Sequence, residues 1–125
     1  MTAPGALVHL VADFADVPDA QLRDATMLSG LLIAAAGAAG LQASGLPIVH
    51  VRPDGGVSAV LMLEECHLIV HAHPARRMLL LDLLAPATKD WSRVLEVFTR
   101  RIPASAVHQD VRHRAGAVTD KGVTH

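Results

Sequence analysis

The stretch from Val57 to Leu84 contains the side chains of this chain that are best suited to chemistry. At its centre is Cys66, the only cysteine, which directly follows the pair Glu64–Glu65. A thiolate is a strong nucleophile, so Cys66 is a candidate catalytic residue. The alternative is that Cys66 is a small buried hydrophobe, as most free cysteines are.

Three histidines in the same stretch form a second candidate site. In a strand that begins at His67, side chains alternate between faces, which places His67, His71 and His73 on one face. Pairs of the form His-x-His bind zinc or copper. His67 and His73 would lie about 20 Å apart at roughly 3.3 Å per residue, so only His71 and His73 can share an ion. A third ligand would come from a neighbouring strand, with His9 and His50 as candidates.

Arginines near the same stretch suggest how a substrate could be held. Arg52, Arg76 and Arg77 can each match a carboxylate with two parallel hydrogen bonds. The alternative is a solvated edge of a sheet. The pair Glu64–Glu65 is a poor acid–base pair, because adjacent residues on a strand face opposite ways.

Hydrophobic periodicity predicts the elements that position these side chains. We expect helices over residues 20–39 and 89–101, and strands over residues 6–14, 46–52, 57–63, 67–73, 78–84 and 106–113. Gly40 is expected to cap the first helix, and Thr88 to begin the second. The second half of the first helix is apolar nearly all round, which predicts burial on two sides. The predicted fold is α+β, a two-layer α/β sandwich with a mostly antiparallel sheet and two helices on one face.

Length and composition narrow the class of protein. The 125 residues predict one domain over 1–125, with a core at about residues 6–114 and a polar tail at 115–125. A net charge of −1 argues against a nucleic-acid partner, and the longest apolar stretch is too short for a membrane span. Without a signal segment, the expected location is cytoplasmic. Low net charge with a mean hydropathy of +0.36 favours self-association.

The motifs of the central stretch resemble those of the bacterial S-adenosylmethionine decarboxylase proenzyme family. Gly56-Val57-Ser58 is similar to that family's G-V-S-G, and ECHLIVHAHP, residues 65–74, is similar to its E-S-H-L-T-I-H-T-W-P-E. The segment HLVADF at residues 9–14 resembles the family's H-L-V-A-E-F. The resemblance covers roughly residues 6–114. It implies the same fold, a homodimer or a heterodimer with a paralogue, and a role in polyamine and spermidine synthesis.

In that family the proenzyme cuts itself between Glu and Ser, and the serine becomes a pyruvoyl group. This group condenses with the substrate amine and withdraws electrons during loss of CO2. The resemblance places the cleaved bond at Glu65–Cys66, with Ser58 and His71 as helpers. A thiol can replace the hydroxyl as nucleophile. However, the resulting thioester also hydrolyses readily, which would leave Cys66 without a pyruvoyl group.

The chain departs from the family pattern at the substrate site. The family's proton-donating cysteine falls at Pro86, which has no proton to donate. The positions that hold the adenosyl group fall on His73 and Ala75, and an upstream aromatic position falls near Arg52. The candidate substrate-binding residues are therefore Arg52, His73 and His67.

Three functions remain open from the sequence. The first is a pyruvoyl-dependent carboxy-lyase that acts on S-adenosylmethionine or another amino acid, with Cys66, His71, Ser58 and Glu65 as catalytic residues. The second is an unprocessed relative that binds a small ligand or a partner, or that uses Cys66 as a thiol. The third is a metal-binding module that uses His71 and His73.

Overall fold

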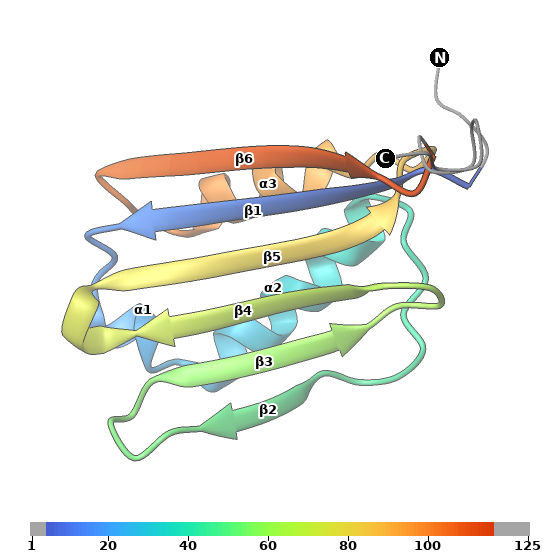
Figure 1. The fold of residues 1–125 in the computed structure, drawn as a ribbon. Coiled ribbons are helices and arrows are strands. Elements are labelled where there is room, and N and C mark those ends of the chain that lie inside the picture. Colours follow the sequence, from blue (N-terminus) through green and yellow to red (C-terminus); the bar gives the residue numbers. More distant parts are fainter. Residues whose placement is uncertain (1–4, 117–125) are drawn as a thin grey trace.

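The computed structural model describes residues 5–116, which form a sheet covered by helices on one face (Figure 1). All neighbouring strands are antiparallel, and their order across the sheet is β2-β3-β4-β5-β1-β6. This arrangement confirms the predicted two-layer α+β sandwich. The strands are β1 (Leu7–Ala15), β2 (Ile48–Val51), β3 (Val57–Met62), β4 (His67–His73), β5 (Met78–Pro86) and β6 (Ala106–Arg114). The helices are α1 (Asp19–Leu22), α2 (Ala25–Ala38), α3 (Ser92–Arg101) and the 3₁₀ turn η1 (Pro74–Arg76).

Strict alternation along the strands divides the sheet into two faces. In β5 every second residue is buried, beginning with Leu79 and continuing through Leu81, Leu83 and Ala85. The same alternation in β1, β3 and β4 directs small and branched apolar side chains towards the helices. The prediction that β4 places His67, His71 and His73 on one face is confirmed, and Leu68, Val70 and Ala72 are buried on the other.

The two long helices seal the apolar face of the sheet. Phe98 of α3 is fully buried and its ring centroid lies 6.3 Å from that of Phe14 in β1. This contact joins α3 to the sheet through aromatic packing. Helix α2 packs its leucines and alanines inward, but Ile33 on its outer side is 49 % exposed. In a single chain the helix is therefore buried on the side that faces the sheet, and burial of its outer side by a partner subunit stays a prediction.

The starts of both long helices differ from the expectation. The predicted first helix is divided at Arg23–Asp24, where the carboxylate of Asp24 accepts a hydrogen bond from the Met27 N–H and begins α2. Helix α3 begins at Ser92 rather than after Thr88, and Trp91 occupies its N-cap position. Gly40 follows α2 with a φ of +71°, which fits its predicted capping role.

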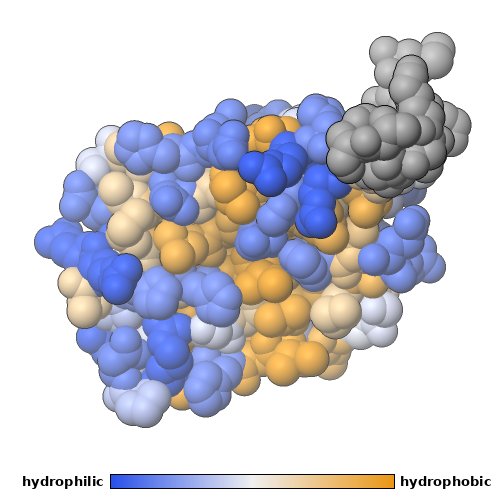
Figure 2. Space-filling model, viewed as in Figure 1, coloured by the Kyte–Doolittle hydropathy of each residue, from blue (hydrophilic) through white to orange (hydrophobic). Residues whose placement is uncertain are grey.

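We call the sheet face turned away from the helices the open face. It carries an apolar band interrupted by polar side chains, visible as the orange region in Figure 2. The band is made by alternate residues of β1, β3, β4 and β5, namely Val11, Val60, Met62, Ile69, Leu80 and Leu84. No described helix is long and apolar enough to span a bilayer.

Candidate active site

The Glu65–Cys66 bond lies at the tip of the β3–β4 hairpin. The Leu63 N–H donates a 3.0 Å hydrogen bond to the Cys66 carbonyl, and the Glu64 N–H donates one of 3.0 Å to the Gln42 carbonyl. Both glutamates are exposed, whereas Cys66 is only 6 % exposed. Burial raises the pKa of the Cys66 thiol, and the nearby charge of Glu65 raises it further. The thiol therefore lies beside an exposed glutamate but is held mainly in its protonated form.

A small cavity of about 50 Å³ adjoins this hairpin tip. Pro86, at the position of the family's proton donor, contributes to its wall together with Lys89 and Glu65. The remaining wall residues are Leu41, Gln42, Leu63 and Glu64. Thus the fold brings the predicted cleavage position close to Pro86, although 20 residues separate Cys66 from Pro86 in the sequence. Lys89, which no sequence motif singles out, supplies an ammonium group there.

A second polar group lies along the hairpin, where Ser58 and His71 face each other across β3 and β4. The Ser58 hydroxyl and His71 Nδ1 are 2.8 Å apart. Arg52 donates from Nη1 to the Ser58 oxygen at 2.6 Å and from Nη2 to the Ala72 carbonyl. The two predicted helpers are therefore hydrogen-bonded to each other, and Arg52 completes the group.

Arg52 is occupied by contacts within the chain. Besides Ser58 and Ala72, it approaches Asp54, with Nε 3.6 Å from the carboxylate. In this structure its guanidinium orders the turn between β2 and β3. Arg76 and Arg77 are exposed, and Arg77 has a φ of +56° after η1.

His73 lies half-buried at the end of β4. Burial lowers its pKa, and the positive charges of Arg52 and Arg76 lower it further. His71 acts in the same direction, and Asp54 opposes these effects. The ring is therefore held neutral at physiological pH. The rings of His71 and His73 have centroids 6.4 Å apart, and His71 bonds to Ser58 rather than to a shared partner of both rings.

The helpers and the cleavage position occupy opposite ends of β4. Five residues separate Cys66 from His71, which corresponds to about 16 Å along an extended strand. Within one chain, the Ser58–His71 pair therefore does not contact the Glu65–Cys66 bond. The structure joins Ser58 with His71, and it joins Glu65 with Pro86, but it keeps these two groups apart.

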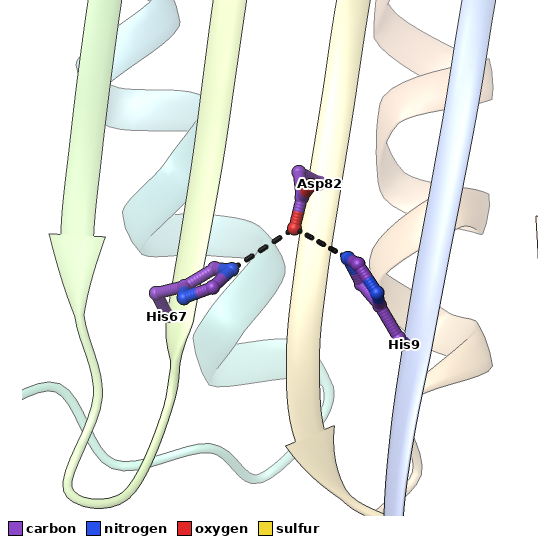
Figure 3. A group of neighbouring side chains, drawn as sticks. All are labelled: His9, His67 and Asp82. Atoms are coloured by element: carbon purple, nitrogen blue, oxygen red, sulfur yellow. Dashed lines mark hydrogen bonds and ion pairs between the residues drawn. The ribbon is translucent and has the colours of Figure 1, made fainter. Parts of the chain in front are cut away.

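His67, a predicted substrate-binding residue, has a different partner. Its Nε2 lies 2.9 Å from Asp82 Oδ1, and the Nε2 of His9 lies 3.0 Å from the same oxygen (Figure 3). The sequence pattern marked both histidines as candidates but not Asp82. The only available signal was that Asp82 interrupts the otherwise apolar run MLLLDLL.

A model of the S-adenosylmethionine decarboxylase family matches residues 8–115 of the sequence. This chain belongs to that family. The match includes β1 through β6 and therefore the whole sheet with both candidate groups. It confirms the resemblance that the motifs around Ser58 and Cys66 had indicated.

Among solved structures, the S-adenosylmethionine decarboxylase of Aquifex aeolicus VF5 has the same fold, with a TM-score of 0.78. The two share 17 % sequence identity over 87 % of this chain and 90 % of that one. At this identity the likeness concerns the fold. A comparison with curated proteins gave no significant match.

Proposed function

We propose that this family member is a pyruvoyl-dependent decarboxylase that cuts itself at the Glu65–Cys66 bond and acts on S-adenosylmethionine or another amino acid. The observation that supports this most directly is the 2.8 Å contact between Ser58 and His71, the two helper positions of the family. The serine and the histidine are hydrogen-bonded to each other on the open face, and Arg52 donates to the serine hydroxyl. Such a polar group on a sheet face supports a chemical role rather than a role in packing. The glutamate on one side of the bond to be cut is exposed at the hairpin tip, whereas Cys66 on the other side is buried.

The chemistry at Cys66 balances with a thiol in place of the hydroxyl. The sulfur attacks the Glu65 carbonyl carbon, and the peptide C–N bond breaks as a thioester forms and the Cys66 nitrogen takes a proton. Loss of the Cα proton of Cys66, with cleavage of its Cβ–S bond, then releases Glu65 as a thiocarboxylate. The dehydroalanine that is left tautomerises, and water replaces its nitrogen as ammonia. A pyruvoyl carbonyl formed in this way supplies an electron sink for decarboxylation.

The substrate site is incomplete in a single uncut chain. The cavity at the hairpin tip has about 50 Å³, whereas sites for drug-sized ligands have about 300–1,000 Å³. Cleavage would free the ends of the hairpin tip and enlarge this space. Lys89 in the cavity wall carries a proton that Pro86 lacks, so it is our candidate for the proton donor.

The second part of the proposal is a homodimer formed through the open face. The apolar band on this face is uncovered in one chain, and the net charge of −1 opposes association only weakly. A twofold axis between two facing sheets, perpendicular to β4, reverses the direction of that strand in the second copy. The Ser58–His71 end of one copy then approaches the Glu65–Cys66 end of the other. This arrangement would overcome the separation of about 16 Å within one chain.

Intact mass of the freshly purified, denatured protein tests the proposal. We expect two fragments divided at Glu65–Cys66, the second lighter than a chain that starts with cysteine and reactive towards hydrazine. The Cys66→Ala variant should stay whole, and Cys66→Ser, which restores the family's residue, should also be cut. A single full-length mass for the wild-type protein would overturn the proposal and favour the unprocessed relative.

A further inference from the structure

We propose that His9, Asp82 and His67 form a binding site for a divalent transition-metal ion of the zinc class. These residues are separated by up to 73 positions in the sequence, yet they meet on the open face of the sheet (Figure 3). The inference does not rest on the proposed decarboxylase function.

The register of three neighbouring strands creates this group. His9 of β1 and His67 of β4 both pair with Leu84 of β5, so the two rings flank that residue from either side. Asp82 lies two residues earlier on β5 and faces the same way. Each ring extends diagonally and directs Nε2 to one carboxylate oxygen of Asp82, at 3.0 Å and 2.9 Å. The backbone of the central strands thus fixes the direction of all three side chains.

The distances are close to those of a coordinated ion. The three ligating atoms lie within 4.8 Å of one another. Zinc bonds to imidazole nitrogen and carboxylate oxygen are about 2.0–2.1 Å long, so tetrahedral ligand atoms lie about 3.3 Å apart. The two nitrogen–oxygen distances are a few tenths of an ångström shorter than this, and the two ring nitrogens lie within 4.8 Å of each other. Small side-chain rotations would therefore admit an ion without movement of the strands.

The donor set suits zinc better than magnesium or calcium. Two imidazoles with one carboxylate match the protein ligands of catalytic zinc sites, and imidazole favours later first-row metals over hard cations. In a single chain, side-chain exposures of 28 % for His9, 30 % for His67 and 38 % for Asp82 leave the group accessible to an ion. The same exposure leaves a fourth coordination position to water.

Hydrogen bonding alone is the competing explanation for the group. In that case both rings carry a proton on Nε2, and one oxygen of Asp82 accepts both bonds. Within residues 5–116, no other hydrogen bond holds either ring. An ion would bond to the Asp82 oxygen and to Nε2 of each ring, and each Nε2 proton would move to Nδ1 of the same neutral ring, which frees the Nε2 lone pair.

The test is a titration of the chelator-treated, full-length protein with Zn²⁺ by calorimetry, and with Co²⁺ by visible absorption. We expect one ion per chain and a cobalt spectrum typical of tetrahedral coordination. Asp82→Asn keeps the size of the side chain but removes its charge, and should weaken Zn²⁺ binding more than about tenfold, the loss that even outer-shell changes can cause. His108→Gln, an exposed histidine of β6 outside the group, is the matched control and should bind normally.

Three results would overturn the inference. They are less than one ion per wild-type chain, undiminished binding in Asp82→Asn, and loss of binding in Cys66→Ala, which would place the ion on the thiol. Because Cys66→Ala cannot process itself, normal binding in that variant also separates this inference from the decarboxylase proposal. If Asp82→Asn fails to fold, as judged by circular dichroism, His9→Gln takes its place, with the same loss expected.

Discussion

At the scale of single residues, Cys66 has two properties with opposite effects on self-cleavage. It follows the predicted cleavage bond at a hairpin tip, but burial and Glu65 raise the pKa of its thiol. The nucleophile is the thiolate, so the fraction of reactive sulfur at neutral pH is lower than for an ordinary cysteine. We therefore expect processing to be slow at neutral pH and faster in mild alkali.

The alkylation rate of Cys66 measures this effect directly. Because Cys66→Ala lacks the only thiol, it gives the background. In the uncut wild-type chain, the rate with iodoacetamide should continue to rise with pH through the range in which the rate of an ordinary thiol levels off. Glu65→Gln removes one cause of the raised pKa and should increase the rate at pH 8.

Glu64→Gln is the matched control for this experiment. Glu64 is exposed at the same hairpin tip but does not contribute to the raised pKa of the thiol. Its removal should leave the rate unchanged. A wild-type rate that levels off below pH 9, or equal rates in both variants, would contradict burial and Glu65 as the causes of the raised pKa.

Most residue-scale features of the site could be predicted only in part from sequence. Ser58 and His71 were matched by motif, and their contact at 2.8 Å follows because both lie on adjacent antiparallel strands. Asp82 could not be assigned to His9 and His67, because that requires the register of three strands. A local pattern contains no information about such long-range pairing.

At the scale of elements, the alternation of apolar and polar residues and the residues that end strands were sufficient to predict most of the sheet. β4 has the predicted bounds, since apolar alternation and Pro74 define it locally. The division between α1 and α2 was missed because Asp24 acts through a cap within a continuous helical pattern. The strand order also needed the structure, because β1 pairs with β5 and β6, which are remote in sequence.

The turn between β2 and β3 depends on close approach of the backbone. A Cβ atom on Gly56 would lie 2.5 Å from the Ala72 carbonyl oxygen and 2.7 Å from Pro74 Cδ, and would clash with Arg52. We expect Gly56→Ala to lower the free energy of unfolding by about 1–3 kcal/mol, as overpacking does. It should also separate Arg52 from Ser58 and slow processing.

Gly45→Ala is the control, because no atom lies within 4 Å of a Cβ atom placed at that residue. Urea unfolding should show a change below about 0.5 kcal/mol for this variant. Equal stabilities for the two variants would mean that the turn tolerates a side chain and that Arg52 is free to move.

At the scale of the whole molecule, the contrast between the two faces of the sheet is the main feature. One face is sealed by α2 and α3, and the other exposes an apolar band that contains both the Ser58–His71 pair and the His9–Asp82–His67 group. A second copy on the open face would bury this band. It would also change the surroundings of every polar group on it.

Val60→Glu tests the homodimer, because Val60 lies half-buried within the open face, between Ile48 and Ile69. In one chain the new carboxylate can reach solvent, whereas in a dimer it would be buried. We expect the dissociation constant of the dimer, measured by sedimentation, to rise more than tenfold. This corresponds to a loss of about 1.4 kcal/mol in the free energy of association. If helpers act across the dimer, the variant should also remain uncut.

Ile33→Glu serves as the control on the opposite side of the molecule. Ile33 is 49 % exposed on the outer side of α2, so its replacement should change neither association nor processing. A Val60→Glu protein that stays dimeric would exclude the open face as the interface. A monomer that is still cut would show that one chain is sufficient for cleavage.

The strand order also bears on whether sheets of different chains can join edge to edge. A sheet that is not closed has two edge strands, in this fold β2 and β6, whose free backbone groups could recruit more strands. β2 has only four residues and lies between Pro47 and Pro53, while β6 carries alternating ionic side chains, among them Asp110 and Arg112. Both features oppose edge-to-edge growth into fibres. The chain can therefore expose the apolar band on its open face while its edge strands resist pairing with other chains.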